Sequence, residues 1–172
     1  MGLFRPDIYQ KSIFDINYMH LKELGITCLV FDLDNTLGKM EQKKSPQQVK
    51  KLIQSLQKDF LVLICSNNVQ RRVKPFFKDL GVGGVCFSLK PFTFGLAKIK
   101  RNYHLKKKEM CLIGDQMITD VLAGNRFHIM TVLVDPMSDK ELLITGVNRE
   151  LEAKIIKRYQ KRGIFERGKY YE

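Results

Sequence analysis

Two aspartates two positions apart are the residues of this chain best suited to do chemistry. Asp32 and Asp34 belong to the heptapeptide Phe-Asp-Leu-Asp-Asn-Thr-Leu at 31–37, which follows an apolar run at 26–31. That run has the length and β-branched content of a buried strand. Neighbouring carboxylates repel each other unless a cation holds them, and closely spaced acidic oxygens are the ligands of hard ions such as Mg²⁺. The heptapeptide therefore predicts a metal-assisted active site at the carboxyl end of a strand.

Polar residues also follow three other predicted strands. Those strands are expected at 60–64, 85–87 and 110–113, and the polar residues after them are, in order, Ser66 with Asn67, Lys90, and Asp115 with Asp120. Taken alone, each is an ordinary turn or helix-start residue. In a doubly wound sheet, however, the carboxyl ends of the strands meet at one crevice. The succession of these residues therefore predicts a single site.

The order of apolar runs predicts an α/β fold. Strands at 26–31, 60–64, 85–87, 110–113 and 129–134 alternate with helical patterns, between an N-terminal helix at 12–24 and a basic C-terminal helix and tail at 139–172. Because each strand is apolar throughout, we expect a doubly wound, mostly parallel five-stranded Rossmann-like sheet with helices on both faces. The 172 residues contain no linker or internal repeat and predict one domain, with a core at about 26–135 and a loosely ordered tail from 163.

The charge of the chain favours an anionic partner. The net charge is +12, and residues 39–108 hold 17 lysines and arginines against three acids. Such a surface favours phosphorylated substrates, anionic lipid or RNA. No apolar run approaches the ~20 residues that span a bilayer, the start has no signal-peptide pattern, and the four cysteines lack zinc or redox spacing. We expect a cytoplasmic protein, with peripheral contact to an anionic membrane as an open possibility.

Taken in order, four segments resemble the four motifs of the haloacid dehalogenase (HAD) phosphohydrolase superfamily. They are Asp-Leu-Asp-Asn-Thr at 32–36, Ser66, Lys90, and Gly-Asp-Gln-Met-Ile-Thr-Asp at 114–120. The first and fourth resemble those of subclass IIIA. The leading stretch, with Pro-Asp-Ile-Tyr at 6–9 and Leu-Lys-Glu-Leu-Gly-Ile at 21–26, is similar to the YqeG family, whose eukaryotic relatives include mitochondrial phosphatidylglycerophosphate phosphatases.

The resemblance implies a role for each site residue. Asp32 is expected to be the nucleophile that forms an aspartyl-phosphate, and Asp34 the general acid and base. Asp32, Asp115 and the backbone carbonyl of Asp34 are expected to hold Mg²⁺. The remaining roles are phosphoryl binding by Thr36, Ser66 and Asn67, charge neutralisation by Lys90, and orientation of Lys90 or a metal-bound water by Asp120.

The spacing of the motifs limits the substrate. Only 34 positions separate Asp32 from Ser66, and 24 separate Ser66 from Lys90, so neither interval holds a folded cap. An open site suits a large substrate or a lipid head group, and with the family resemblance it favours phosphatidylglycerophosphate. A soluble phosphatase acting on a nucleotide, sugar phosphate or phosphorylated macromolecule remains an alternative.

A role from another class also stays open, that of a basic RNA- or ribosome-binding protein on the same scaffold. No RNA-binding motif supports it, and Phe76, Phe77, Phe92 and Phe94 are expected in core and rim packing rather than under stacked bases. The oligomeric state has no signal in the sequence.

Overall fold

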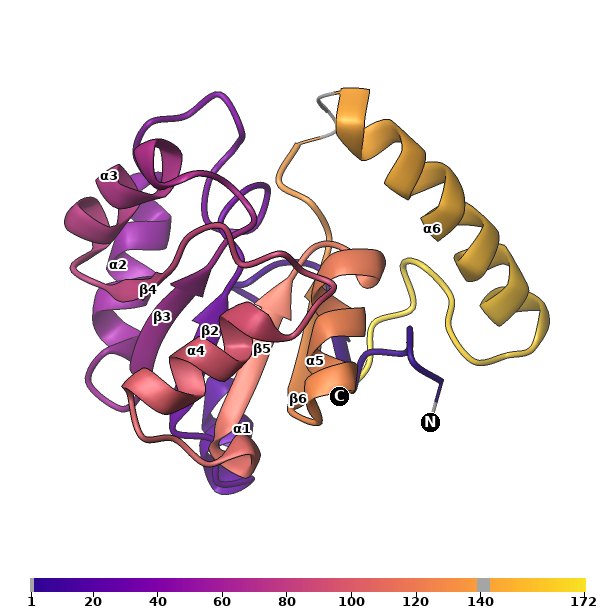
Figure 1. The fold of residues 1–172 in the computed structure, drawn as a ribbon. Coiled ribbons are helices and arrows are strands. Elements are labelled where there is room, and N and C mark those ends of the chain that lie inside the picture. The colour runs from indigo at the N-terminus through magenta and orange to yellow at the C-terminus, as the bar shows by residue number, and fades with distance from the viewer. Residues whose placement is uncertain (1, 139–142) are drawn as a thin grey trace.

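A six-stranded, all-parallel sheet organises the computed structural model, which describes residues 2–138 and 143–172 (Figure 1). The strands lie in the order β1-β6-β5-β2-β3-β4. Their bounds are β1 Ile8–Gln10, β2 Cys28–Phe31, β3 Leu61–Cys65, β4 Gly83–Val85, β5 Met110–Gly114 and β6 Met130–Val134. The predicted parallel α/β sheet is confirmed, but the count of five strands is wrong. The missed strand, β1, has only three residues, too few for a strand pattern to stand out.

Helices cover both faces of the sheet because alternate strand residues point to opposite sides. Leu29 and Phe31 of β2 pack with α1 (Tyr18–Glu23), α2 (Gln47–Leu56) and α3 (Gln70–Leu80). Cys28 and Val30 pack on the other face with α4 (Phe94–Asn102) and α5 (Leu122–Phe127). The intervals from β2 to β3 and from β3 to β4, described in full, contain α2 and α3 respectively and no inserted cap.

The N-terminal helix is shorter than the predicted 12–24. It begins at Tyr18, where Asn17 caps it by accepting a hydrogen bond from the backbone of His20. Upstream, the Ser12 hydroxyl accepts a bond from the Phe14 amide and donates one to Asp15. Such local side-chain bonds compete with helix formation, which explains why the apolar spacing over 12–16 did not produce a helix.

The third strand is also displaced from its predicted position, 85–87, to Gly83–Val85. Gly84 lies so close to β3 that a Cβ atom there would be 1.9 Å from the Ile64 carbonyl oxygen. Two glycines carry almost no strand propensity, so the sequence pattern placed the strand too late.

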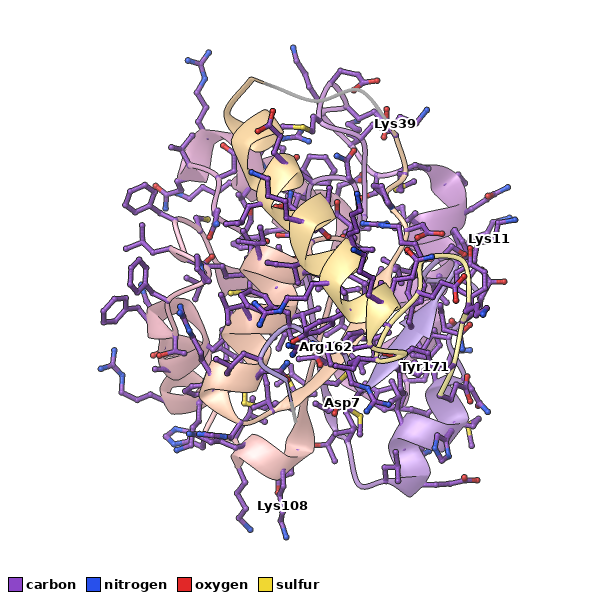
Figure 2. The ribbon with its side chains drawn as sticks, turned by 90° about the vertical axis from the view of Figure 1, so that its right-hand side faces the viewer. Asp7, Lys11, Lys39, Lys108, Arg162 and Tyr171 are labelled. Atoms are coloured by element: carbon purple, nitrogen blue, oxygen red, sulfur yellow. The ribbon has the colours of Figure 1, made fainter. Side chains whose placement is uncertain are left out.

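The C-terminal segment packs against the edge strand β1. Tyr9 and Tyr171 exchange two backbone hydrogen bonds of 2.8 and 2.9 Å, and Phe165 is only 3% exposed. Figure 2 views this side of the molecule, with α6 (Leu143–Lys161) crossing it and Tyr171 beside the helix end near Arg162. The expectation of a loosely ordered tail is therefore wrong, because its aromatic side chains complete a small core. Residues 139–142, the start of the predicted helix, lie outside the described residues.

No helix within 2–138 or 143–172 combines the length and apolar character needed to cross a membrane.

The packing of the tail predicts a large stability effect at Phe165. We expect Phe165→Ala to lower the free energy of unfolding by about 3 kcal/mol, because it empties a buried site beside Tyr9. The measurement is urea denaturation followed by circular dichroism. Leu151→Ala is the control, since Leu151 is 51% exposed and should change stability by less than about 0.5 kcal/mol. Equal effects of the two substitutions would contradict the packing of the tail.

Candidate active site

The central strand β2 delivers Asp32 to the middle of the sheet. Phe31, its last residue, pairs with Ile64 of β3 on one side and Ile113 of β5 on the other. The chain proceeds from β2 outward to β3 and β4, then returns to β5 on the opposite side, so Asp32 lies where the strand order reverses. Open α/β sheets bind ligands at such a point. In Figure 2 this end of the sheet lies towards Lys39, opposite Lys108.

Lys90 reaches this point from the loop between β4 and α4. Its Nζ lies 2.5 Å from Oδ1 of Asp32 and 2.7 Å from Oδ1 of Asp120, and its side chain is 2% exposed. Burial lowers the pKa of Lys90, but Asp120 and Asp32 raise it by more, so the lysine is a permanent cation. The structure thus brings together Asp32, Lys90 and Asp120, and the expected contact between Asp120 and Lys90 is present.

Negative charge exceeds positive charge in this buried cluster. Oxygens of Asp32, Asp115 and Asp120 all lie within 4.8 Å of one another. Burial raises the pKa of Asp32 to about 7, with Lys90 opposing the rise, and burial together with Asp32 and Asp120 raises the pKa of Asp115 well above its usual range. Three carboxylates against one lysine form a set of hard oxygen donors that fits a divalent cation such as Mg²⁺.

The carboxylate of Asp34 lies outside this acidic group and is held by an arginine. Arg72, in the first turn of α3, donates from Nε and one terminal nitrogen to Oδ1 of Asp34 at 3.1 and 2.7 Å. Asn68 donates to Oδ2 at 3.2 Å. Arg72 also donates to the carbonyls of Lys39 and Gln42. Arg72 and Asn68 were missed by the sequence analysis, and nothing in the pair Arg71-Arg72 marks which arginine faces the site.

Asn67, expected to bind the phosphoryl group, contacts the backbone of Lys90 through its side-chain amide. Its Oδ1 accepts hydrogen bonds from the Lys90 amide at 2.6 Å and from the Ser88 hydroxyl at 2.8 Å, and its Nδ2 donates to the Lys90 carbonyl at 2.8 Å. The Asn67 amide is thus committed to the backbone that carries Lys90. Ser66 is buried, and its hydroxyl accepts a bond from the Asn68 amide.

The β5 side of the site depends on close packing. A Cβ atom at Gly114 would lie 2.3 Å from Cγ of Asp120, so only glycine leaves room for that carboxylate. Asp120 belongs to η2 (Met117–Val121), a single π-helical turn of the kind often found at functional sites. The Thr36 hydroxyl donates to Oδ1 of Asp115 at 3.3 Å, which links the β2 and β5 loops.

Comparisons with protein families agree with this geometry. The model of haloacid dehalogenase-like hydrolases matches residues 29–90, and a HAD-hydrolase-like model matches residues 89–141. Between them the two matched segments contain all of the residues placed above at the ends of β2, β3 and β5 and in the loop after β4.

Individual relatives are phosphatases by name. The chain is 36% identical to "Probable phosphatase YqeG" of Bacillus subtilis, over 93% of this chain and 94% of that protein. It is 24% identical to "Phosphatidylglycerophosphate phosphatase 1, chloroplastic/mitochondrial" of Arabidopsis thaliana, over 92% of this chain but only 49% of that longer protein.

A solved structure shares the fold. It is 3-deoxy-D-manno-octulosonate 8-phosphate phosphatase of Moraxella catarrhalis in complex with magnesium ion, phosphate ion and KDO. The TM-score is 0.51 at 16% identity, over 83% of this chain and 99% of that one. At this identity the likeness concerns the fold alone.

The acidic cluster predicts that Mg²⁺ stabilises the protein. At about one hundred times its Kd, the ion should add about 2.7 kcal/mol to the free energy of unfolding, seen as a higher melting temperature. We expect Asp115→Asn to remove most of this gain. Without the ion, that variant should melt no lower than wild type, because the substitution relieves repulsion with Asp32.

Asp59→Asn is the matched control, because it makes the same charge change at an exposed residue paired with Lys22. An undiminished Mg²⁺ gain in Asp115→Asn, or an equal loss in Asp59→Asn, would contradict the placement of the metal.

Proposed function

Because the chain belongs to the haloacid dehalogenase-like hydrolases and is a phosphatase of that superfamily, we propose that Asp32 is the nucleophile in hydrolysis of a phosphate monoester. An Asp32 oxygen attacks phosphorus, the ester P–O bond breaks, and the leaving alkoxide takes a proton from Asp34. Water then attacks the phosphorus of the aspartyl-phosphate while Asp34 accepts a proton from it. The Asp32–phosphorus bond breaks, which releases inorganic phosphate and restores the Asp32 carboxylate.

One observation carries this proposal, the 2.5 Å contact between Lys90 Nζ and Asp32 Oδ1. Phosphoryl transfer depends mainly on positioning and on stabilising charge at the transferred group. A buried cation beside the attacking carboxylate supplies that charge where water does not screen it. Asp120 holds the other side of the ammonium group at 2.7 Å, so Lys90 cannot turn away. We assign Asp120 the role of positioning Lys90.

The metal that fits the acidic cluster is Mg²⁺, held by Asp32 and Asp115 with the Asp34 carbonyl. When bound, it offsets negative charge on the phosphoryl oxygens and on the clustered carboxylates. Thr36, in the loop after β2, and Ser66, directly after β3, are the proposed donors to the phosphoryl oxygens, since both hydroxyl groups are buried at this end of the sheet. On phosphate binding the Thr36 hydroxyl turns its proton from Asp115 to a phosphoryl oxygen.

Arg72 acts through Asp34 in this proposal. Two nitrogens of a planar guanidinium on one carboxylate oxygen, with Asn68 on the other, fix the direction of the carboxyl group. A general acid must lie within hydrogen-bond reach of the atom that it protonates. Arg72 is therefore a positioning residue, outside contact with the substrate.

For the substrate we propose phosphatidylglycerophosphate, converted to phosphatidylglycerol by a protein in peripheral contact with the membrane. Three observations support it: the name of the Arabidopsis thaliana relative, the absence of a cap in the fully described intervals around α2 and α3, and the net charge of +12. A large anionic lipid can cover an open active site and exclude water from it, whereas a small sugar phosphate would leave the site exposed to solvent.

The substrate is tested by phosphate release from phosphatidylglycerophosphate in mixed micelles with Mg²⁺, beside soluble phosphomonoesters. We expect turnover of the lipid, and a fall of at least about a thousandfold in kcat for Asp32→Asn. Asp59→Asn should keep wild-type rates. Turnover of soluble esters alone would contradict the lipid substrate. Full activity of Asp32→Asn would contradict the role of Asp32 as nucleophile.

The positioning role predicts an asymmetric effect at the Arg71-Arg72 pair. Arg72→Gln should lower kcat by about ten- to a hundredfold with little change in KM, because Asp34 loses its orientation while phosphate binding remains. Arg72→Lys should restore only part of kcat, since an ammonium group lacks the planar fork. Arg71→Gln, at the exposed neighbour, is the control. An increase in KM at constant kcat would instead assign Arg72 to substrate binding.

A further inference from the structure

The loop between β4 and α4, together with the first residue of α4, exposes large apolar side chains beside the active site. Phe87, Leu89, Phe92 and Phe94 are 64, 43, 59 and 67% exposed, and we call these four residues the apolar loop. The rings of Phe92 and Phe94 lie 6.1 Å apart. The Phe92 amide donates a hydrogen bond to the Leu89 carbonyl. Single exposed apolar residues are common on protein surfaces, but four within eight positions of the chain are a concentration that indicates a binding surface. Phe92 and Phe94 were expected in core and rim packing, and their exposure shows that they lie outside the core.

The same backbone that directs Lys90 inward directs this patch outward. Side chains alternate along the loop: Ser88 and Lys90 are 1 and 5% exposed, whereas Phe87 and Leu89 face solvent. Phe87 and Leu89 have φ values of 52° and 59°, a left-handed conformation that is costly for bulky residues. Hydrogen bonds from the Phe87 amide to Asn68 and from the Ser88 amide to Ser66 hold the loop in this form. The apolar loop is therefore fixed to the rim of the crevice, and Figure 1 shows the β4–α4 connection crossing the strand ends.

Positive charge surrounds the apolar loop. No acidic residue occurs from position 80 to position 108, a stretch that holds seven lysines and arginines. Lys98 follows Phe94 by one turn of α4, and the Arg126 guanidinium donates to the Pro91 carbonyl. Burial raises the pKa of the Cys86 thiol, directly before Phe87, and the positive charges of Lys74 and Lys98 oppose that rise.

We propose that the apolar loop inserts into the surface of an anionic lipid bilayer, with the flanking cations against the lipid phosphates. The proposal rests on the phosphatase function and names the surface through which that site meets its lipid. Aromatic and aliphatic side chains bordered by lysine and arginine are the composition of segments that lie in a membrane interface. Each nearby cation adds to the attraction between this surface and anionic lipid. A lipid phosphate monoester matches this arrangement: its anionic head group would enter the crevice, and its acyl chains would lie beside the apolar loop.

The absence of tryptophan from the sequence permits a direct test. Phe94→Trp places a single fluorescent probe in the apolar loop, and Leu24→Trp places one at an equally apolar, 49% exposed position directly after α1. Leu24 precedes β2, so it lies at the amino ends of the strands, where Figure 1 shows α1. Asp32 is left unchanged in both variants, because the vesicle lipids are phosphodiesters rather than phosphate monoesters and therefore stay intact. The vesicles contain phosphatidylglycerol and phosphatidylcholine, or phosphatidylcholine alone.

We expect anionic vesicles to shift the Phe94→Trp emission to the blue, and acyl-chain-brominated lipids to quench it. Leu24→Trp should show neither effect. In cosedimentation, Phe92→Ser/Phe94→Ser should raise the Kd for anionic vesicles at least about tenfold, while Met19→Ser/Leu24→Ser should leave it within about twofold. Melting curves confirm that each variant is folded.

Any of three results would overturn the proposal. The first is no vesicle binding by the wild-type chain, which would favour a protein partner for the apolar loop. The others are vesicle binding without a fluorescence response from Phe94→Trp, and equal responses from the two probes. The test is independent of turnover. Lipid hydrolysis without insertion would contradict membrane insertion of the apolar loop and support the proposed function. Insertion without hydrolysis of any phosphomonoester by the wild-type chain would support the membrane surface and contradict the proposed function.

Discussion

A lysine buried between two carboxylates is the interaction on which the rest of this structure depends. Lys90 lies 2.5 Å from Asp32 and 2.7 Å from Asp120, with Asp115 in the same acidic group. Buried charges are costly unless they are paired, and removing one partner leaves the other uncompensated. The site therefore demands that segments from β2, β5 and the β4–α4 loop meet within hydrogen-bond distance. A parallel sheet with its strand order reversing at β2 provides that meeting point.

The neighbours of Lys90 show how the fold meets this demand. Asn67 binds both backbone polar groups of the lysine, and Gly114 leaves the space that Asp120 fills. Ser88 and Lys90 point inward. Their neighbours Phe87 and Leu89 have left-handed backbone angles and point into solvent. The lysine proposed to act in catalysis and an exposed apolar surface thus belong to one short segment. That arrangement suits the proposed substrate, which has a charged head group and acyl chains.

The sequence predicted the residues at the strand ends because each follows a local apolar run. Apart from Asp120 beside Lys90, which the family resemblance implied, it did not predict partners brought together by long-range packing. Arg72 and Arg71 are alike in sequence, and only the position of α3 against the β2 loop directs one of them to Asp34. The strand β1 is recognisable only from its pairing with β6 and Tyr171. The alternation that exposes Phe87 and Leu89 depends on left-handed backbone angles, which no apolar pattern encodes.

The central claim, that Asp32 carries the phosphoryl group, is tested most directly by trapping it. The wild-type protein is mixed with excess phosphomonoester and Mg²⁺, quenched in acid within one turnover, and digested for mass spectrometry. We predict that the peptide containing Asp32 gains the mass of one phosphoryl group, which hydroxylamine removes, and that Asp32→Asn shows no such peptide. Phosphate release at full rate with no modified peptide at any quench time, or a phosphoryl group on another residue, would contradict the account.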